Sequence, residues 1–230
     1  MRFQLDRQQA VLVAIFPVLA MALLNHFYTA WLFTVNASLF WVADSVHFVL
    51  VPLLVWCLVL RPAGIGAAQC GLSRPADARV GGMEVGTTVF LALALAAWTW
   101  PVGRVLGLVF WEHCCTFQYQ QTIPRTPAAA WLVCVYMAAT AALGEELIYR
   151  ALPWLYAQAV VPERWRRTVY VLATSTVFAL AHSEQGIGGI LSTFWFGVVA
   201  SRMYSRYRSL WPLVLGHFLY NMIVYAPWTR

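Results

Sequence analysis

The chain has 230 residues, of which 61% are hydrophobic and only 10% are charged. A soluble domain carries about 25% charged residues, so this composition excludes an ordinary soluble protein and indicates an integral membrane protein in a lipid bilayer. The net charge of +6 comes from arginines that lie between apolar runs rather than in one patch, which argues against a nucleic acid partner.

Seven apolar runs separated by polar or Gly- and Pro-containing turns predict an all-α, polytopic membrane bundle of seven transmembrane helices. The first run follows two arginines and resembles a signal peptide, but the later runs favour an uncleaved first span. Without repeats or linkers, we expect a single membrane-embedded domain, residues 1–230. The predicted spans are 10–24, 46–60, 85–102, 128 into the acidic run at 144–150, 168–182, 190–204 and 210–226.

Residues 26–44 are aromatic and mixed in character, and they are expected to form an interfacial or re-entrant segment. If this segment does not cross and the N-terminus is cytoplasmic, twelve arginines, Arg150 among them, fall on the cytoplasmic side and three on the far side. This bias favours seven spans, because cytoplasmic loops are enriched in basic residues. An eight-span chain with an outward N-terminus remains the alternative.

The five cysteines lack the spacing of a zinc or redox site. Cys57 and Cys134 lie within apolar runs and are expected to be small buried hydrophobic residues. The sequence His113-Cys114-Cys115 is compatible with metal binding, but a structural zinc site needs four ligands and no matching cluster appears. We therefore predict no metal and no cofactor.

One run breaks the apolar pattern most clearly: Gly144-Glu145-Glu146-Leu147-Ile148-Tyr149-Arg150. Burying unpaired carboxylates in lipid costs several kcal/mol, so these acids are expected to face the protein interior or a wet cavity and to mark function. Glu146 and Arg150 are four residues apart and can pair, whereas Glu145 points about 100° away and can be the free carboxylate. Alternatively, both acids cap a basic cluster at the membrane surface. Pro153 predicts that the helix kinks or ends near 149–152.

Two later spans carry further polar residues at helical spacing. Phe178 and His182 share one face, and His217 and Asn221 share another. A carboxylate and an imidazole, here Glu145 and His182, can deprotonate water and return the proton to a leaving group. His217 and Asn221 can donate hydrogen bonds to a developing oxyanion. The set predicts water-mediated hydrolysis of an amide. His47, a lone histidine near a helix end, is interpreted as structural.

Other chemistries fit the same residues less well. The nucleophile motif GxSxG is absent, and Ser183 is a poor candidate nucleophile. A Glu/His/His set can hold zinc with an open position, but the HExxH spacing is missing, so a metallopeptidase ranks second. A proton-coupled transporter using these groups as relays is a further alternative.

The expected depths of these residues in the membrane are difficult to reconcile with this interpretation. If Thr168 starts a span at the cytoplasmic surface, His182 lies roughly 20 Å from it, whereas Glu145 and His217 are expected nearer that surface. A broken helix at the glycines of residues 186–189 would resolve the difference, because irregular backbone is tolerated where it lines a wet cavity.

The three motifs together resemble those of the CAAX-protease and bacteriocin-processing family, a group of glutamic-type intramembrane endopeptidases. The resemblance covers roughly the last hundred residues and implies a helical catalytic core, about 126–226, that opens to the cytoplasm. The residues that carry it are Glu145-Glu146-x-x-x-Arg150, Phe178-x-x-x-His182 and His217-x-x-x-Asn221.

By position, the resemblance implies that Glu145 and His182 activate the water. It implies that His217 and Asn221 stabilise the oxyanion. Structural support is the role implied for Glu146 and Arg150, with Phe178 beside them.

The resemblance also implies a membrane-anchored protein substrate. Eukaryotic members cut prenylated CAAX proteins, many bacterial relatives act in bacteriocin immunity or maturation, and others process C-terminal sorting tails. The compact length and all-arginine basic residues suggest a bacterial cytoplasmic (inner) membrane protein, so sorting tails or similar substrates are favoured over prenylated ones. A non-catalytic immunity or binding protein on the same fold is the alternative. The oligomeric state is not predicted.

Overall fold

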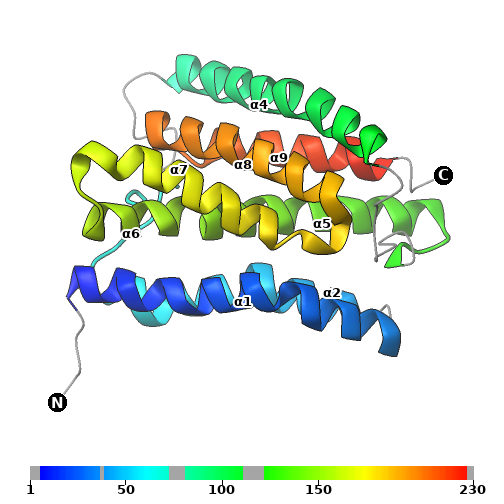
Figure 1. Ribbon diagram of the computed structural model, residues 1–230, viewed down its shortest axis with the longest axis horizontal. Helices are drawn as coiled ribbons and strands as arrows, with labels where there is room; N and C mark the ends of the chain where they lie inside the picture. The colour runs from blue at the N-terminus through cyan, green and yellow to red at the C-terminus, as the bar shows by residue number, and fades with distance from the viewer. Residues whose placement is uncertain (1–5, 37–38, 73–80, 111–121, 227–230) are drawn as a thin grey trace.

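The computed structural model describes residues 6–36, 39–72, 81–110 and 122–226. Every regular element in these ranges is a helix, so the predicted all-α class is confirmed. Long helices run alongside one another in layers, with α1 and α2 on one face of the bundle and α4 on the opposite face (Figure 1).

The N-terminal hairpin, residues 7–60, forms the first of these layers. It consists of α1 (Arg7–Val35) and a returning helix, residues 39–60. The side chain of Asp6 accepts a hydrogen bond from the Gln9 backbone, and the Gln9 side chain accepts one from the Asp6 backbone, which caps the start of α1. The returning helix comprises α2 (Leu39–Ser45), η1 (Val46–Leu50), α3 (Val51–Val55) and η2 (Trp56–Leu60).

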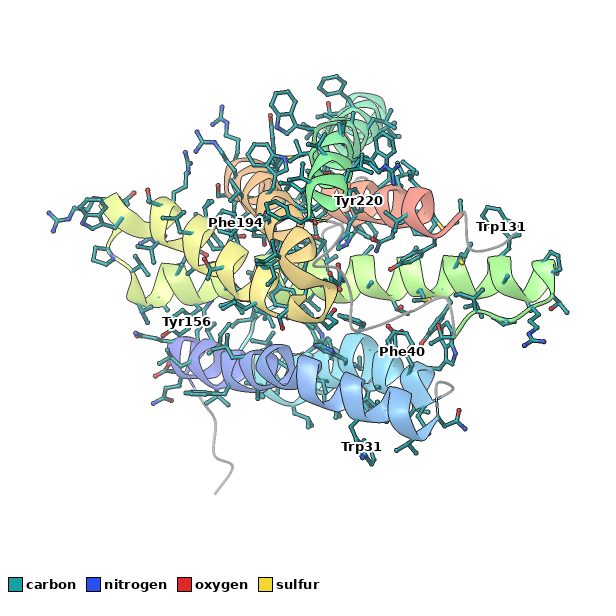
Figure 2. All side chains as sticks on the ribbon, turned by 45° about the vertical axis from the view of Figure 1, so that its right-hand side comes forward. Trp31, Phe40, Trp131, Tyr156, Phe194 and Tyr220 are labelled. Atoms are coloured by element: carbon teal, nitrogen blue, oxygen red, sulfur yellow. The ribbon has the colours of Figure 1, made fainter. Side chains whose placement is uncertain are left out.

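The prediction of an interfacial or re-entrant segment at residues 26–44 is wrong. Residues up to Val35 continue α1, and residues from Leu39 begin the returning helix. Trp and Tyr side chains favour the headgroup level but do not interrupt helical hydrogen bonding, so aromatic content alone did not indicate a break. Figure 2 shows Trp31 of this hairpin pointing away from the bundle.

The rest of the chain packs on this hairpin. One continuous helix of 34 residues, the α5–α6 rod (residues 127–160), crosses the middle of the bundle. It contacts the hairpin along its length, while α4 lies against α8 and α9. The elements are α4 (Gly81–Val109), α5 (Pro127–Glu146), η6 (Leu147–Ala151), α6 (Leu152–Val160), α7 (Glu163–Leu180), η7 (Ser183–Gln185), α8 (Gly186–Tyr207) and α9 (Trp211–Tyr225).

The acidic run lies near the middle of the α5–α6 rod, not at its end. The expectation that the span finishes there is therefore wrong. Pro153 lies inside the continuous rod, at the start of the part labelled α6. The preceding turn, Leu147–Ala151, is π-helical, and this wider turn lets the helix continue past the proline. The predicted difference in depth between the acids and His182 thereby disappears.

Three helices in the described part of the chain are long and apolar enough to cross a bilayer: Leu39–Leu60, Val85–Val109 and Pro127–Val160. Large hydrophobic side chains such as Leu58 and Leu132 are about 70% exposed on the outer surface, as expected for contact with lipid. The chain is an integral membrane protein, and the count of seven spans remains a prediction.

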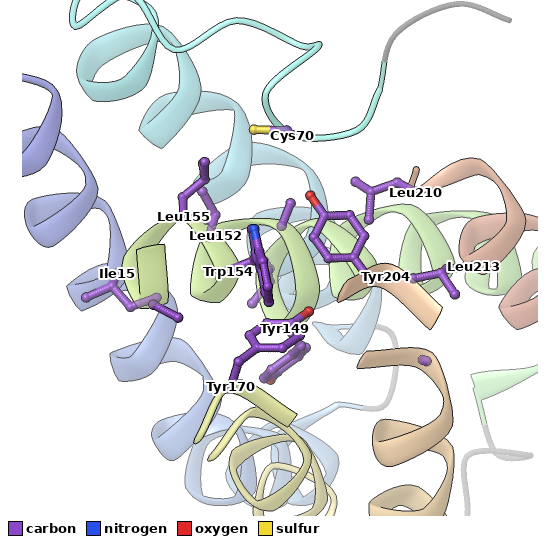
Figure 3. Close-up of a cluster of buried hydrophobic side chains, with 14 of the residues drawn as sticks. Ile15, Cys70, Tyr149, Leu152, Trp154, Leu155, Tyr170, Tyr204, Leu210 and Leu213 are labelled. Atoms are coloured by element: carbon purple, nitrogen blue, oxygen red, sulfur yellow. The ribbon is translucent and has the colours of Figure 1, made fainter. Parts of the chain in front are cut away.

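A cluster of buried, mostly hydrophobic side chains lies where α6, α7 and α8 meet the turn before α9 (Figure 3). We call Cys70, Trp154, Tyr170, Tyr204 and Arg208 the aromatic end. The Trp154 and Tyr170 rings meet edge to face, with centroids 4.9 Å apart. The Arg208 guanidinium lies 4.5 Å from the Trp154 ring centre and 5.1 Å from that of Tyr204. Burial raises the pKa of the Cys70 thiol to about 11.

The loop after the hairpin is fastened to this aromatic end by a close backbone approach. The Leu210 N–H donates to the Gly71 carbonyl at 3.0 Å. Gly71 has a φ of 74°, and a Cβ there would lie 2.8 Å from the Arg208 carbonyl oxygen, so the contact requires glycine.

The cysteine predictions have mixed outcomes. Cys134 is buried as expected, but Cys57 is exposed, because it lies on the outward face of the returning helix. Cys114 and Cys115, with His113, lie outside the described residues.

Candidate active site

The paired acids end α5 and point to different partners. Glu146 and Arg150 form the predicted ion pair one turn apart, with Oε2 and Nε 3.3 Å apart and both side chains fully buried. The guanidinium also lies 4.5 Å from the centre of the Phe178 ring. Arg150 is thus fully buried within the rod rather than exposed in a loop.

Glu145 lies between two imidazoles from separate helices. Its Oε1 is 3.9 Å from Nε2 of His182, which follows α7, and its Oε2 is 3.7 Å from Nε2 of His217 in α9. Both distances exceed that of a direct hydrogen bond but suit a bridge through one water. We call Glu145, Glu146, Arg150, His182 and His217 the polar centre.

The His182 ring is oriented by its own helix. Its Nδ1 lies 2.8 Å from the carbonyl oxygen of Phe178, one turn earlier. A carbonyl can only accept, so Nδ1 carries the hydrogen and Nε2 of the neutral ring is a proton acceptor directed toward Glu145. The residue remains 19% exposed in its side chain, the most open of the polar centre's imidazoles.

The His217 ring is oriented by the second acid. Its Nδ1 lies 2.8 Å from Oε1 of Glu146, whose charge is balanced by Arg150. Nδ1 therefore donates to the carboxylate. As a consequence, His217 can donate a hydrogen bond from Nε2 only when both ring nitrogens are protonated.

Aromatic rings enclose the polar centre. Phe178 is 2% exposed and contacts Arg150, and its ring meets that of His182 edge-on, with centroids 4.7 Å apart. Phe196 lies against His217, with centroids 4.6 Å apart. Asn221 lies one turn beyond His217 on α9 and is 8% exposed. Such low-dielectric surroundings strengthen the interactions among the charged groups.

Three buried ionisable residues near Glu145 were missed by the sequence analysis as parts of the site. Asp44 is 6% exposed, His47 2% and Glu184 1%. Asp44 accepts a hydrogen bond from Thr140 of α5, His47 is stacked on Phe48, and Glu184 lies two residues after His182. The available signal was the general one that ionisable groups in apolar runs face the protein interior.

In the described ranges, no group of three or more His, Cys, Asp or Glu side chains has the geometry to hold a metal ion. The Glu/His/His set considered for zinc is therefore not gathered as ligands in this conformation.

Fold and site together define a helical membrane protein with a buried acid–imidazole centre. Residues 127–223 match the family model described as Type II CAAX prenyl endopeptidase Rce1-like. The match covers less than half of the chain, and it shows that this C-terminal segment is similar to a family of membrane proteases. The match includes every predicted site residue and excludes the N-terminal hairpin. No curated protein and no solved structure matches the chain.

Proposed function

We propose that the chain is a glutamic-type intramembrane endopeptidase that hydrolyses a peptide bond of a membrane-anchored or lipidated protein. The observation that carries this proposal is the buried carboxylate of Glu145 within 3.9 Å of Nε2 of His182 and 3.7 Å of Nε2 of His217. A carboxylate beside an imidazole with a free acceptor nitrogen is suited to general-base activation of water.

In the proposed reaction, Glu145 and His182 take a proton from a water molecule as its oxygen bonds to the peptide carbonyl carbon. The resulting tetrahedral intermediate carries a negative oxygen. When the C–N bond breaks, the proton returns to the leaving nitrogen, so the products are a new carboxyl terminus and a new amine. Water, not a side chain, is the nucleophile, and the enzyme forms no covalent intermediate.

His217 and Asn221 are the proposed donors to the negative oxygen. This role requires the doubly protonated form of His217, because its Nδ1 already donates to Glu146. In this scheme Glu146 and Arg150 hold His217, and Phe178 shields the charges from lipid. The proposed catalytic core spans residues 126–226.

The proposed substrates are C-terminal sorting tails or similar membrane-anchored bacterial proteins, cleaved in the cytoplasmic membrane. The family description supports a substrate held at the membrane. A site buried mid-rod also requires the scissile peptide to enter the bilayer, which a membrane anchor would provide.

The test compares Glu145→Gln with the wild-type chain by mass spectrometry of membrane-protein termini in cells. A terminus that depends on Glu145 identifies the substrate, and a peptide spanning it then serves for kinetics with purified protein. Loss of the general base should lower turnover about 10³-fold. The matched control is Glu163→Gln, the same chemical change at an exposed position of α7. Turnover by Glu145→Gln within tenfold of wild type would end the proposal.

Two measurements separate this proposal from its alternatives. A zinc enzyme would contain stoichiometric zinc and lose activity with chelators, whereas we expect cleavage to be unaffected by them. A non-catalytic immunity protein would protect a host equally well after Glu145→Ala or His182→Ala, whereas we expect both changes to abolish cellular function.

A further inference from the structure

Two side chains of the polar centre come from two inner helices of the bundle, and each of these helices is covered by an outer layer. Glu145 belongs to α5 and His217 to α9, and Oε2 of Glu145 is 3.7 Å from Nε2 of His217. The N-terminal hairpin packs on α5 from one face of the bundle, whereas α4 packs on α9 from the opposite face (Figure 1). Both outer layers lie outside the family match at residues 127–223.

A glycine directly before His217 brings α9 against the backbone of α4. A Cβ on Gly216 would lie 2.8 Å from the carbonyl oxygen of Ala92 and 3.2 Å from its Cα. Real Cβ atoms do not come as close as 2.8 Å to another atom, so this approach requires glycine. Successive residues of an α-helix point about 100° apart. Gly216 therefore faces α4, while the His217 ring faces the two acids of α5.

A further contact one turn later involves the same side of α9. Tyr220 lies four residues after Gly216 and shares its face of the helix. A Cβ on Gly103 of α4 would lie 2.7 Å from the Tyr220 hydroxyl oxygen, so a glycine again stands where the two helices meet. Two such contacts along one face oppose both rotation and sliding of α9, and they fix the direction in which His217 points.

The hairpin makes an equivalent approach to α5 from the opposite side. A Cβ on Gly144, the residue before Glu145, would lie 2.7 Å from the Phe48 Cβ and 2.8 Å from the Phe48 carbonyl oxygen. One turn earlier, the Thr140 hydroxyl of α5 donates to Oδ2 of Asp44 at 3.1 Å, which sets the register of the hairpin along α5. Each of the two reacting residues is thus preceded by a glycine in close contact with an outer layer.

Resting on the proposed peptidase function, we propose that Gly216 is a positioning residue through which α4 fixes the place of His217 relative to Glu145. Gly144 does the same for Glu145 from the side of the hairpin. The His217 ring is also held through its Nδ1, 2.8 Å from Oε1 of Glu146. A displacement of α9 would therefore change the distances from His217 to both acids. The geometry of the active site thus depends on helices outside the matched segment.

The test uses the full chain, purified in detergent, with the peptide whose cleavage depends on Glu145. Gly216→Ala places a methyl group against the Ala92 carbonyl oxygen and displaces His217. We expect kcat to fall between about tenfold and about a hundredfold with KM unchanged, because misplacing a catalytic group by about 1 Å slows turnover without weakening substrate binding. Each variant is assayed well below its own unfolding temperature, so that only folded protein is compared.

The matched control is Gly71→Ala, which introduces an equally close contact away from the polar centre. A Cβ there would lie 2.8 Å from the Arg208 carbonyl oxygen, and the φ of 74° adds backbone strain. This variant should lower the unfolding temperature at least as much as Gly216→Ala, yet leave kcat within about twofold of wild type. Gly107→Ala on α4, where a Cβ meets nothing within 4 Å, should lower neither kcat nor the unfolding temperature.

Three results would overturn this inference: Gly216→Ala with the kcat of the wild type, Gly216→Ala impaired only through a raised KM, or Gly71→Ala with an equal loss of kcat. If Gly216→Ala does not fold, Gly144→Ala is measured in its place, and a lower kcat at unchanged KM is again expected. Failure of both variants to fold would assign the glycines to packing alone and also overturn the inference. If no terminus in cells depends on Glu145, the proposed function itself fails, so the two failures are distinguishable.

Discussion

Two buried or partly buried arginines lie near the α5–α6 rod, and their charges are balanced in different ways. In the polar centre, Arg150 is fully buried and paired with Glu146 at 3.3 Å. In the aromatic end, Arg208 lies in a turn against the faces of Trp154 and Tyr204. Burial lowers the pKa of Arg208 from its ordinary value. One cation is balanced by a carboxylate and the other mainly by π electrons.

The comparison distinguishes an arginine that helps to arrange the side chains of the polar centre from one that stabilises the fold. A buried ion pair is weak evidence for stability, because the loss of solvation offsets most of the attraction. The Arg150–Glu146 pair does something else: it leaves the second oxygen of Glu146 directed at Nδ1 of His217. The cation–aromatic contacts of Arg208 touch no group of the polar centre and join the loop, α6 and α8. Tyr170 joins the two regions, because its hydroxyl donates to the Arg150 carbonyl at 3.1 Å. We therefore expect changes in the polar centre to affect catalysis and changes at Arg208 to affect only stability.

The largest effect is expected from breaking the ion pair. Arg150→Met leaves Glu146 buried without its cation, which should cost about 3–5 kcal/mol of unfolding free energy. The double variant Arg150→Met with Glu146→Gln should regain most of that stability in thermal unfolding, because no unpaired charge remains. It should still fail to cleave, since His217 has lost its carboxylate. A double variant as active as the wild type would contradict this view of the pair.

A smaller effect is expected from separating the hairpin from the α5–α6 rod. Gly144→Ala introduces a Cβ 2.7 Å from the Phe48 Cβ, and such overpacking should cost about 1–3 kcal/mol and reduce cleavage. Gly86→Ala is the matched control, because a Cβ there meets nothing within 4 Å. By helix propensity it should stabilise the chain by roughly 0.5–1 kcal/mol. Equal unfolding temperatures for the two variants would show that the close approach is not required.

A pH-dependent effect is expected from the aromatic end. The folded state raises the pKa of Cys70 to about 11, so folding favours the neutral thiol. Its contribution is fully present below the unfolded pKa near 9 and is lost as pH rises from 9 to 11. The loss should be on the order of 2 kcal/mol. Thermal unfolding across this range should show a steeper decline for wild type than for Cys70→Ala, and parallel curves would refute the assignment.

The smallest effect is expected for Arg208→Met. Loss of the contacts with Trp154 and Tyr204 should cost about 1 kcal/mol, the usual strength of a cation–aromatic interaction. Cleavage should remain within about twofold of the wild type, because none of these groups touches the polar centre. A large loss of turnover with unchanged stability would mean that the two regions are coupled.

Sequence reasoning identified residues that the fold brings together because their spacing carries the information. Residues four apart share a helix face, and polar residues in apolar spans face inward whatever the packing. These rules were sufficient to predict the Glu146–Arg150 pair and to select Glu145, His182 and His217. The Nε2 atoms of the two histidines lie 3.9 and 3.7 Å from the Glu145 carboxylate.

The contribution of the hairpin could not be predicted in the same way. Asp44 and His47 have ordinary local surroundings in sequence, and their meeting with the site depends on which face of residues 39–60 packs on α5. That choice is fixed by the contact of Gly144 with Phe48, which joins positions far apart in the chain. Similarly, Pro153 was taken as a helix end because a wider turn was not considered.

The π turn at Leu147–Ala151 has a consequence for insertions and deletions in this chain. A π turn accommodates one residue more than an α turn, so the residues on its two sides are out of step by one position. Removing a single residue from this turn would convert it to an α turn, and the residues downstream would keep nearly their present orientation. Removing a residue from the α-helical part that follows would instead rotate everything downstream by about 100°. The π turn is therefore the place in this rod where a length change of one residue would spare both regions.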